Sequence, residues 1–273
     1  HLPTKEKVEA RRNKAGSAED PAYWSNDRGF WPPEGISNTV LTASAIITHD
    51  AAGKHLFTGR WFMILGALDP AFGGSDKPTV RFGKMGEIAG GRWGIQVFPP
   101  VQIKLVASQT YPVTYQIRDR LRELAGSINM DGAAYICLPE NCGVDDTGHA
   151  GCCDVIQVGW SHKIIRIQFG GSPSDDPVNY EDLRPASEVY DDKSAEMWFR
   201  VRDAVYHEQL KGLDPAAAEQ FCTRLYIDNG TKIQLQPKSR EGKSGMKSYR
   251  SLFGKSPDEA DTVAILLEVA RQR

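Results

Sequence analysis

Residues 60–69 read RWFMILGALD, an almost continuous apolar run that ends in the carboxylate of Asp69. A run of this kind predicts a central strand buried on both faces, and a carboxylate at its exit is well placed to point into a site. Pro70 and a Gly-Gly pair follow, so Asp69 could instead simply end the strand in a turn. Asp76, in the same loop, fits a solvated turn residue.

Segments rich in β-branched and aromatic residues flank this run and are separated by Gly, Pro, Asp and Ser. They predict consecutive antiparallel strands. The predicted strands besides the run itself are TVLTASAIITH at 39–49, TVRFGKMG at 79–86 and WGIQVFPPVQIKLVAS at 93–108. Apolar residues then recur at helical spacing in residues 110–128, which predicts a helix that crosses over the sheet.

A strand, helix, strand unit is predicted next, from NCGVDD at 141–146, GCCDVIQVGW at 151–160 and KIIRIQFGG at 163–171. Such a crossover makes its two strands parallel. If the first of them lies beside the 60–69 strand, the carboxylates that end both strands, Asp69 and Asp145, converge.

The C-terminal third is predicted to be mostly helical. SEVYDDKSAEMWFRVRDAVYHEQL at 187–210 predicts one long amphipathic helix, and residues 214–225 predict a second, before short strands near 225–228 and 232–237. In SPDEADTVAILLEVARQR, at 256–273, Ser256 can cap a terminal helix, with Pro257 in its first turn. We expect this helix to lie across the sheet.

The predicted fold class is therefore α+β or α/β, with a mixed central sheet of antiparallel and then parallel strands flanked by helices. Residues 1–40 are polar and rich in Pro and Gly, which predicts a linker or tail, and residues 41–273 form one predicted domain. The chain begins with His1 rather than methionine, which suggests a fragment.

Composition excludes several classes of protein. The 273 residues are 40% hydrophobic and 25% charged, as in ordinary globular proteins. No apolar run approaches the roughly 20 residues of a membrane span, and no secretory signal is present, so we expect an intracellular protein without a membrane partner. The formal charge of −2 argues against a uniformly basic nucleic-acid coat, although a local basic strip could bind phosphates. No G-x-x-x-x-G-K-[ST] motif occurs.

Three acidic motifs are the strongest functional signal: LDPAFGGSD at 68–76, VDDTG at 144–148 and SPDEAD at 256–261. One of Asp145 and Asp146 is expected to form an Asx-type turn that caps the following helix. Adjacent strand residues face opposite sides, so only one of the two can join a cluster easily, and we prefer Asp145. Asp258 and Asp261 share a helix face. Compensation of the helix dipole explains Asp258 equally well, and Asp261 ranks slightly first.

Converging carboxylates repel one another unless a cation neutralises them, and oxygen ligands suit hard cations such as Mg²⁺ or Mn²⁺. We therefore expect a site for two divalent ions, of which one activates water and the other stabilises the leaving oxygen of a phosphodiester.

Taken together, the three motifs and their order resemble the nuclease domain of the large terminase subunit of tailed double-stranded DNA bacteriophages, over roughly residues 55–273. The resemblance implies a ribonuclease H-like fold and a metal-dependent endonuclease that cuts concatemeric viral DNA in the host cytoplasm with little sequence specificity. The family's catalytic metal ligands would fall on Asp69, Asp145 and the Asp258 and Asp261 pair, with Asp146 as the alternative to Asp145.

The same resemblance implies double-stranded DNA, an ATPase motor domain absent from this chain, a small terminase subunit and a portal protein as partners. Residues 237–258 read PKSREGKSGMKSYRSLFGKSPD, directly upstream of the terminal acidic pair. Cations there would grip DNA phosphates without reading sequence, although a solvated loop is an equal alternative. The predicted DNA contacts are Lys238, Arg240, Lys243, Lys247, Arg250 and Lys255.

Other constellations point less clearly to chemistry. Cys137, Cys142, His149, Cys152 and Cys153 are close in sequence but lack the paired spacing of structural zinc sites, so we expect buried thiols. His162 and His207 fit surface positions. The stripe of Met197, Trp198, Val201 and Val205 predicts core packing.

Two other functions remain open at the level of sequence. A different ribonuclease H-like nuclease, such as a junction resolvase, would prefer four-way junctions to linear or supercoiled duplex. A non-catalytic DNA-binding or portal-docking module would tolerate loss of the carboxylates.

Overall fold

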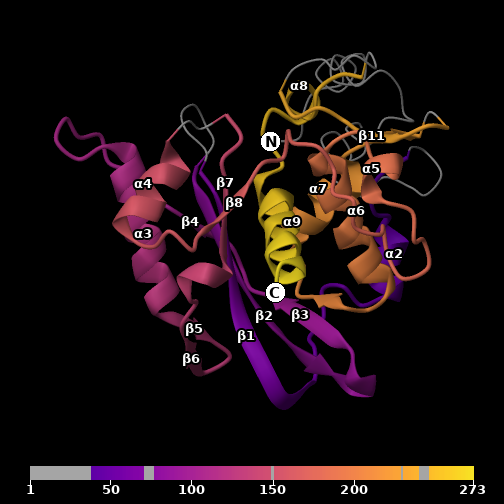
Figure 1. Cartoon of the computed structure of the whole chain (residues 1–273), viewed down its shortest axis with the longest axis horizontal. Helices are drawn as coiled ribbons and strands as arrows, with labels where there is room; N and C mark the ends of the chain where they lie inside the picture. The colour runs from indigo at the N-terminus through magenta and orange to yellow at the C-terminus, as the bar shows by residue number, and fades with distance from the viewer. Residues whose placement is uncertain (1–37, 71–76, 149–150, 229, 240–245) are drawn as a thin grey trace, which may run out of the picture.

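The computed structural model describes residues 38–70, 77–148, 151–228, 230–239 and 246–273 (Figure 1). Its strands are β1 (Phe57–Asp69), β2 (Thr79–Ile88), β3 (Trp93–Val97), β4 (Val101–Gln102), β5 (Ile128–Met130), β6 (Ala133–Tyr135), β7 (Cys142–Asp145), β8 (Ile165–Ile167), β9 (Leu210–Lys211), β10 (Tyr226–Asp228) and β11 (Ile233–Leu235). Its helices are α2 (Ala43–Thr48), α3 (Val113–Gly126), α4 (Cys152–Gly159), α5 (Ala186–Val189), α6 (Lys193–Tyr206), α7 (Pro215–Thr223), α8 (Tyr249–Phe253) and α9 (Asp258–Arg271), with short 3-10 turns at Ala89–Gly91 and Pro139–Asn141.

The central sheet has the strand order β8-β7-β1-β2-β3-β9, and β4 also pairs with β2. β1, β2 and β3 are antiparallel neighbours, whereas β7 and β8 run parallel to β1 on its other side. This is the predicted order of antiparallel and then parallel strands. In the register of β1 and β7, Leu68 lies opposite Val144, which brings the next residues, Asp69 and Asp145, to the same edge of the sheet.

The burial of β1 accounts for the apolar run that ends in Asp69. Its first half is largely exposed, whereas residues Ile64–Asp69 are buried. That second half lies between β2 and β7 and is covered on both faces, which is why the sequence there does not alternate between polar and apolar residues.

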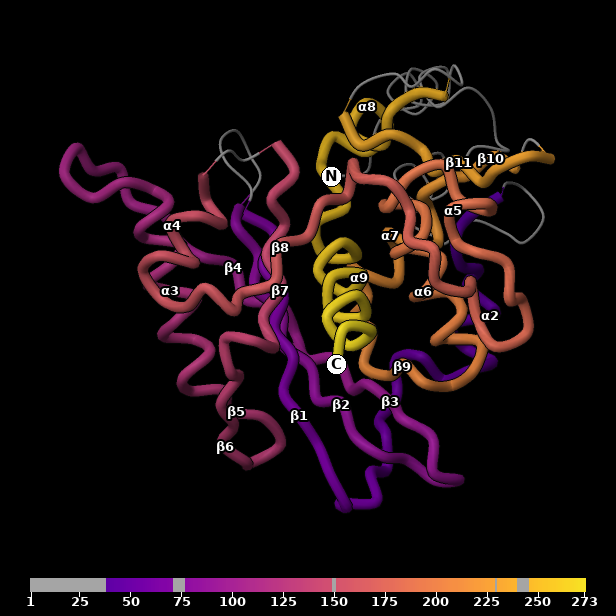
Figure 2. The backbone as a smooth tube through the Cα atoms, in the orientation of Figure 1, coloured from indigo at the N-terminus to yellow at the C-terminus, as the bar shows by residue number. Residues whose placement is uncertain are grey.

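Helices cover the two faces of the sheet in separate layers (Figure 1). α3 and α4 pack on one face over a core that includes Leu68, Ile117 and Leu121. α9, α6 and α7 cover the other face over a larger core. Figure 2 shows α9 running alongside β1 and β7, and residues Ala260–Ala270 are all buried because the helix lies between the sheet and α6 with α7.

One glycine permits this close approach. A Cβ built on Gly143 of β7 would lie 2.6 Å from Val269 Cγ2 and 2.8 Å from Ile265 Cγ2, both on α9. Any larger residue at this position would push α9 away from the strand that ends in Asp145.

Several element predictions were wrong in detail. The predicted strand at 39–49 contains α2, because Thr42 Oγ1 accepts a hydrogen bond from Ala45 N at 3.1 Å and starts a helix. The predicted helix at 187–210 is two helices, α5 and α6, since Asp192 caps α6 while Tyr190 bridges to Ile233. Ser256 is not the cap of α9, whose N-cap is Pro257.

Two further segments differ from prediction. The predicted basic loop at 237–258 contains α8, which Ser248 caps by accepting a hydrogen bond from Ser251 N. The strand pair β5–β6 follows α3 in a segment for which the sequence predicted no strand. Among the described residues, no helix is both long and apolar enough to cross a bilayer.

Candidate metal centre

Three carboxylates from two elements meet at one edge of the sheet. Asp69 is the last residue of β1, and Asp258 and Asp261 lie in the first turn of α9. Each of the three offers an oxygen atom, and these atoms all lie within 4.8 Å of one another. The fold therefore brings together side chains from distant parts of the chain, while their role as metal ligands stays a prediction.

Asp145 lies beside this group at the end of β7 but is not one of the three. Its Oδ1 accepts a hydrogen bond from the backbone N–H of Thr147 at 2.8 Å, and its charge acts on both Asp69 and Asp261. Asp145 is thus held at the rim of the carboxylate group by its own turn.

Asp146 faces elsewhere. Its Oδ2 is 2.5 Å from Arg166 Nη1, and Arg166 also pairs with Asp154 of α4. The two adjacent aspartates therefore separate as expected for neighbouring strand positions, with Asp145 toward the carboxylate group and Asp146 toward α4.

The cluster is buried, which makes its negative charge unfavourable without a cation. Asp69 is 5% exposed, Asp145 3% and Asp261 fully buried. Burial raises the pKa of the Asp69 carboxyl well above its usual range; the Lys238 ammonium opposes this rise, and Asp258, Asp261 and Asp145 reinforce it. Burial likewise raises the pKa of Asp145, against the effects of Lys238 and of the Thr147 hydrogen bond.

Lys238 places a positive charge inside this group. Its Nζ is 2.6 Å from Asp261 Oδ2 and 4.6 Å from the centroid of the Phe169 ring. Burial disfavours its charge, but Asp261, Asp69 and Asp145 outweigh burial and raise the pKa of Lys238. The sequence predicted this lysine as a DNA contact; the structure places its ammonium among the carboxylates, where a bound cation would also lie.

Three of the other predicted DNA contacts lie in the segment that leads into α9. Lys247, Arg250 and Lys255 are exposed in the segment that carries α8 and leads into α9. Arg240 and Lys243 are outside the described residues.

Sequence reasoning missed two side chains that hold Asp261. Trp198 Nε1 donates a hydrogen bond to Asp261 Oδ1 at 2.8 Å, and Arg224 Nη1 lies 3.8 Å from the same oxygen. Trp198 is a core residue, as predicted, yet it also contacts the candidate ligand. No local pattern could reveal this, because α6, α7 and α9 meet only in the folded chain.

The oxygen donors present fit a hard divalent cation. Among the described residues, Asp261 Oδ2 is buried and has no hydrogen-bond partner, although it pairs electrostatically with Lys238. A buried carboxylate oxygen in that state has an unused lone pair, and a group of three carboxylates without Cys or His suits Mg²⁺ or Mn²⁺ rather than zinc.

The cysteines take no part in this group. All five are free and buried, as predicted, and the Sγ atoms of Cys137 and Cys142 lie 3.3 Å apart between β1 and β7. His162 is exposed and His207 is half-buried, while His149 is outside the described residues.

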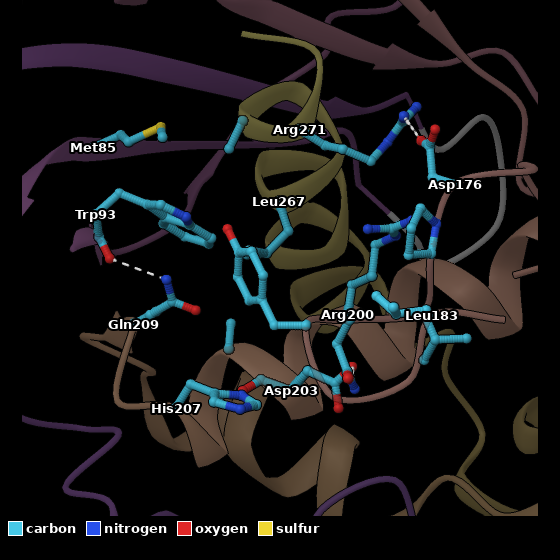
Figure 3. A pocket seen from close by; sticks show the side chains of 16 residues that line it. Met85, Trp93, Asp176, Leu183, Arg200, Asp203, His207, Gln209, Leu267 and Arg271 are labelled. Atoms are coloured by element: carbon cyan, nitrogen blue, oxygen red, sulfur yellow. Dashed lines mark hydrogen bonds and ion pairs between the residues drawn. The ribbon is translucent and has the colours of Figure 1, made fainter. Parts of the chain in front are cut away.

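A separate pocket of about 560 Å³ lies between the C-terminal end of α9, α6 and the loop before α5 (Figure 3). Trp93 and Leu267 line its apolar side, and Arg200, Asp203 and His207 line the opposite side. None of the predicted carboxylate ligands lines it, so it is distinct from the candidate metal centre.

The mixed sheet, its flanking helices and the carboxylates at the ends of β1 and β7 define a ribonuclease H-like fold of the kind found in terminase nucleases. Neither a family model nor a curated protein matches this sequence.

Solved structures with a similar fold include chains from bacteriophage Sf6. The nuclease domain of the large terminase subunit gp2 of bacterial virus Sf6 aligns with a TM-score of 0.54 and 17% identity, covering 84% of this chain and 98% of that chain. A lysine-to-alanine variant of gp2c of the Sf6 large terminase subunit, with calcium, gives a TM-score of 0.56 at 16% identity over 84% and 98% of the two chains. The nuclease domain with the same lysine-to-alanine substitution, with manganese, gives a TM-score of 0.54 at 15% identity, again over 84% and 98% of the two chains.

Proposed function

We propose that this chain is a divalent-metal-dependent DNA endonuclease domain that cuts concatemeric viral DNA during genome packaging. The observation that carries the proposal is the group of the buried Asp69 and Asp261 with the half-buried Asp258, with Asp145 at its rim, in a terminase-type fold. Two of the similar Sf6 structures are named with calcium and with manganese, which supports a divalent metal as the cofactor of the proposed site.

The carboxylates would supply the ligands for Mg²⁺ or Mn²⁺, with two ions expected. Ions bound there would polarise the scissile phosphate and lower the pKa of water so that it can attack. Asp69 and Asp261 would bind from opposite elements, β1 and α9, and Asp258 and Asp145 would complete the site. Asp146 is disfavoured as a ligand, because it is already paired with Arg166.

Lys238 would have to leave Asp261 when a cation binds, because an ammonium and a divalent ion cannot share Oδ2. A lysine released at this edge would be free to contact a DNA phosphate, in line with its predicted role. Lys247, Arg250 and Lys255 would extend that contact along the exposed segment before α9.

The wider assignment follows from the same fold. We propose that residues 41–273 form the nuclease domain, that the chain works in the host cytoplasm, and that its partners are double-stranded DNA, an ATPase motor, a small terminase subunit and a portal protein. The predicted linker at residues 1–40 lies outside the described residues up to residue 37. Little sequence specificity is expected, because phosphate contacts carry no base information.

Plasmid cleavage tests the proposal. The purified chain should nick and linearise supercoiled DNA with Mg²⁺ or Mn²⁺ but not in EDTA, and Asp69→Asn should lower the rate by at least about 100-fold, because the asparagine amide is a poor ligand for a hard cation. Asp131→Asn is the matched control, since Asp131 is exposed and pairs with Lys54. Asp69→Asn that cleaves at the wild-type rate would overturn the proposal.

The same cleavage assay compares the roles of Asp145 and Asp146. It also distinguishes the proposed nuclease from the two alternative functions. Asp145→Asn should slow cleavage strongly, whereas Asp146→Asn should mainly disturb the ion pair with Arg166 and retain most of the activity. Preference for four-way junctions over linear or supercoiled duplex would favour a junction resolvase. Absence of cleavage by the wild-type chain with either metal would favour a non-catalytic docking module.

A further inference from the structure

The carboxylate of Asp261 is held differently at its two oxygens. Oδ1 accepts the hydrogen bond from Trp198 Nε1 at 2.8 Å and faces Arg224 Nη1 at 3.8 Å. Oδ2 faces Lys238 Nζ at 2.6 Å and, within the described part of the chain, has no hydrogen-bond partner. The contacts of Oδ1 come from buried side chains, whereas the contact of Oδ2 comes from a flexible lysine whose side chain is 26% exposed.

Trp198 is fixed in place. It is fully buried on α6, and its ring lies 4.7 Å from the ring of Phe221 at an angle of 59°. A buried indole N–H needs an acceptor, and Asp261 Oδ1 is that acceptor. Rotating the indole would break this hydrogen bond and the ring packing together, so the position of the donor is set by the packing of α6 against α9.

Arg224 is equally constrained. It is 2% exposed, and its Nε and Nη2 both donate to the Gln236 carbonyl, at 3.0 and 2.9 Å. Its guanidinium carbon lies 4.3 Å from the centroid of the Trp198 ring. The remaining nitrogen, Nη1, is buried, has no hydrogen bond to the described residues and faces Asp261. The guanidinium is therefore a fixed positive charge beside Oδ1.

We infer that Trp198 and Arg224 are positioning residues that fix Oδ1 of Asp261, so that Asp261 binds a divalent cation through Oδ2 alone. The inference rests on the proposed metal site and adds the residues that set its geometry. A carboxylate with both oxygens unrestrained could rotate or bind through both atoms. With Oδ1 held by the Trp198 hydrogen bond and by the neighbouring Arg224 charge, Oδ2 is the oxygen that can exchange Lys238 for a hard cation.

Hydrogen bonds to a ligand from outside the metal's own coordination shell commonly change metal affinity by about 10- to 100-fold when they are removed. Trp198→Phe keeps an aromatic ring for Phe221 and Arg224 but removes the N–H. We expect it to weaken Mn²⁺ binding, measured by calorimetry, by about 10-fold or more. Trp93→Phe is the matched control, because Trp93 lies in β3 away from Asp261 and should bind Mn²⁺ as the wild type does.

Tryptophan emission gives a readout that loss of packing would not mimic. Mg²⁺ binding changes the field at the indole that is hydrogen-bonded to Asp261, so titration should shift the emission of the wild type and of Trp93→Phe. The shift should disappear in Trp198→Phe even at Mg²⁺ concentrations that saturate its site. Circular dichroism checks that the variant is folded; if it is not, Arg224→Lys, which keeps the charge but loses the planar stacking, should weaken Mn²⁺ binding instead.

The outcomes separate the two proposals. Folded Trp198→Phe that binds Mn²⁺ with wild-type affinity, or that keeps the full Mg²⁺-dependent emission shift, would overturn the positioning role and leave the proposed nuclease intact. If Trp198→Phe does not fold, wild-type Mn²⁺ affinity in Arg224→Lys would overturn it. A wild-type chain that binds neither Mn²⁺ nor Mg²⁺ would overturn both.

Discussion

At the residue scale, the candidate site is governed by how buried charges are neutralised. Three carboxylates, Asp69, Asp145 and Asp261, act on Lys238, and the structure gives this lysine an ion pair with Asp261 and an aromatic surface at Phe169. Asp69 has its pKa raised by burial and by its acidic neighbours. The group is therefore arranged for a cation, and Lys238 takes that place in this structure.

Replacing this lysine tests the competition directly. Lys238→Ala should lower the melting temperature in EDTA, because the carboxylates lose a neighbouring positive charge. It should also enlarge the rise in melting temperature on adding Mn²⁺, because the metal no longer displaces an ammonium; each additional kcal/mol corresponds to about 2–4 °C in a chain of this size. Scanning calorimetry measures both effects.

Lys255→Ala is the control, since Lys255 is exposed and should leave the Mn²⁺ response unchanged. A Mn²⁺-induced rise in Lys238→Ala no larger than in the wild type would show that the lysine does not compete with the metal.

At the element scale, α9 carries part of the site on a first turn that has no side-chain cap of its own. Other elements supply the missing contacts. Gln220 Oε1 of α7 accepts a hydrogen bond from Ala260 N at 2.7 Å, and the fully buried Arg81 of β2 donates to Thr262 Oγ1 at 2.9 Å. Arg81 also pairs with Asp214, the N-cap of α7, at 2.7 Å. The position of Asp258 and Asp261 thus depends on β2 and α7.

A buried ion network joins α6 to the other end of α9. Glu196 is fully buried, accepts a hydrogen bond from Ser174 Oγ at 2.6 Å and pairs with Lys193 and Arg200. Lys193 also reaches Glu268 of α9 at 3.3 Å. Burial by itself would raise the pKa of Glu196, but the hydrogen bonds from Ser174 and the charge of Lys193 outweigh it and lower the pKa.

Glu196→Gln should therefore destabilise the fold by about 3 kcal/mol at neutral pH, because it leaves the half-buried cations Lys193 and Arg200 without their buried partner. A folded-state pKa below the unfolded value of about 4.3 means that the contribution is present above that pH and is lost as pH falls through the folded pKa. Denaturant unfolding between pH 7 and pH 3 should show a difference that is constant above about pH 5 and shrinks below about pH 4.

Glu123→Gln is the comparison, because Glu123 is exposed in its pair with Arg120 and should change stability by less than about 0.5 kcal/mol. A loss in Glu196→Gln that is equally small, or that grows as the pH falls, would contradict the assigned role of the network.

At the scale of the whole molecule, a chain of net charge −2 can hold DNA only through a local concentration of cations. Lys247, Arg250 and Lys255 lie on the segment that leads into α9 and its carboxylates. Such an arrangement would place phosphate contacts next to the candidate site without a basic coat over the whole surface.

Salt dependence measures this arrangement. Replacing Lys247, Arg250 and Lys255 together by Gln should weaken duplex binding and reduce the slope of log K against log salt by about 0.9 for each phosphate that the protein no longer neutralises. Fluorescence anisotropy at several salt concentrations, in Ca²⁺ or EDTA to prevent cleavage, provides the slope. Gln replacement of three exposed cationic side chains elsewhere on the molecule serves as the control: Lys54, Lys163 and Arg184.

An unchanged slope after replacement of Lys247, Arg250 and Lys255 would show that DNA binds to another part of the molecule. A reduced slope in the control variant as well would show that binding is spread over the surface.

The sequence alone predicted that the sheet is mixed, with antiparallel and then parallel strands. It also predicted the βαβ unit and the acidic residues that could form a site. These predictions were possible because some local patterns constrain distant contacts. An apolar run without alternation, as in Ile64–Leu68, indicates a central strand. Carboxylates at the ends of parallel strands lie at the same edge of the sheet. In residues 39–49, β-branched residues predicted a strand, whereas the Thr42 side chain can also cap a helix. In the structure Thr42 caps α2, so this segment is helical.

How the site is held became visible only in the folded chain. The structure separated Asp145 from Asp146, because β7 turns one toward the carboxylates and the other toward Arg166. It also brought Lys238, Trp198 and Arg224 to Asp261 from three segments that share no sequence periodicity. Packing of α6, α7 and α9 over one face of the sheet sets these distances, and a sequence read along one dimension carries no signal for them.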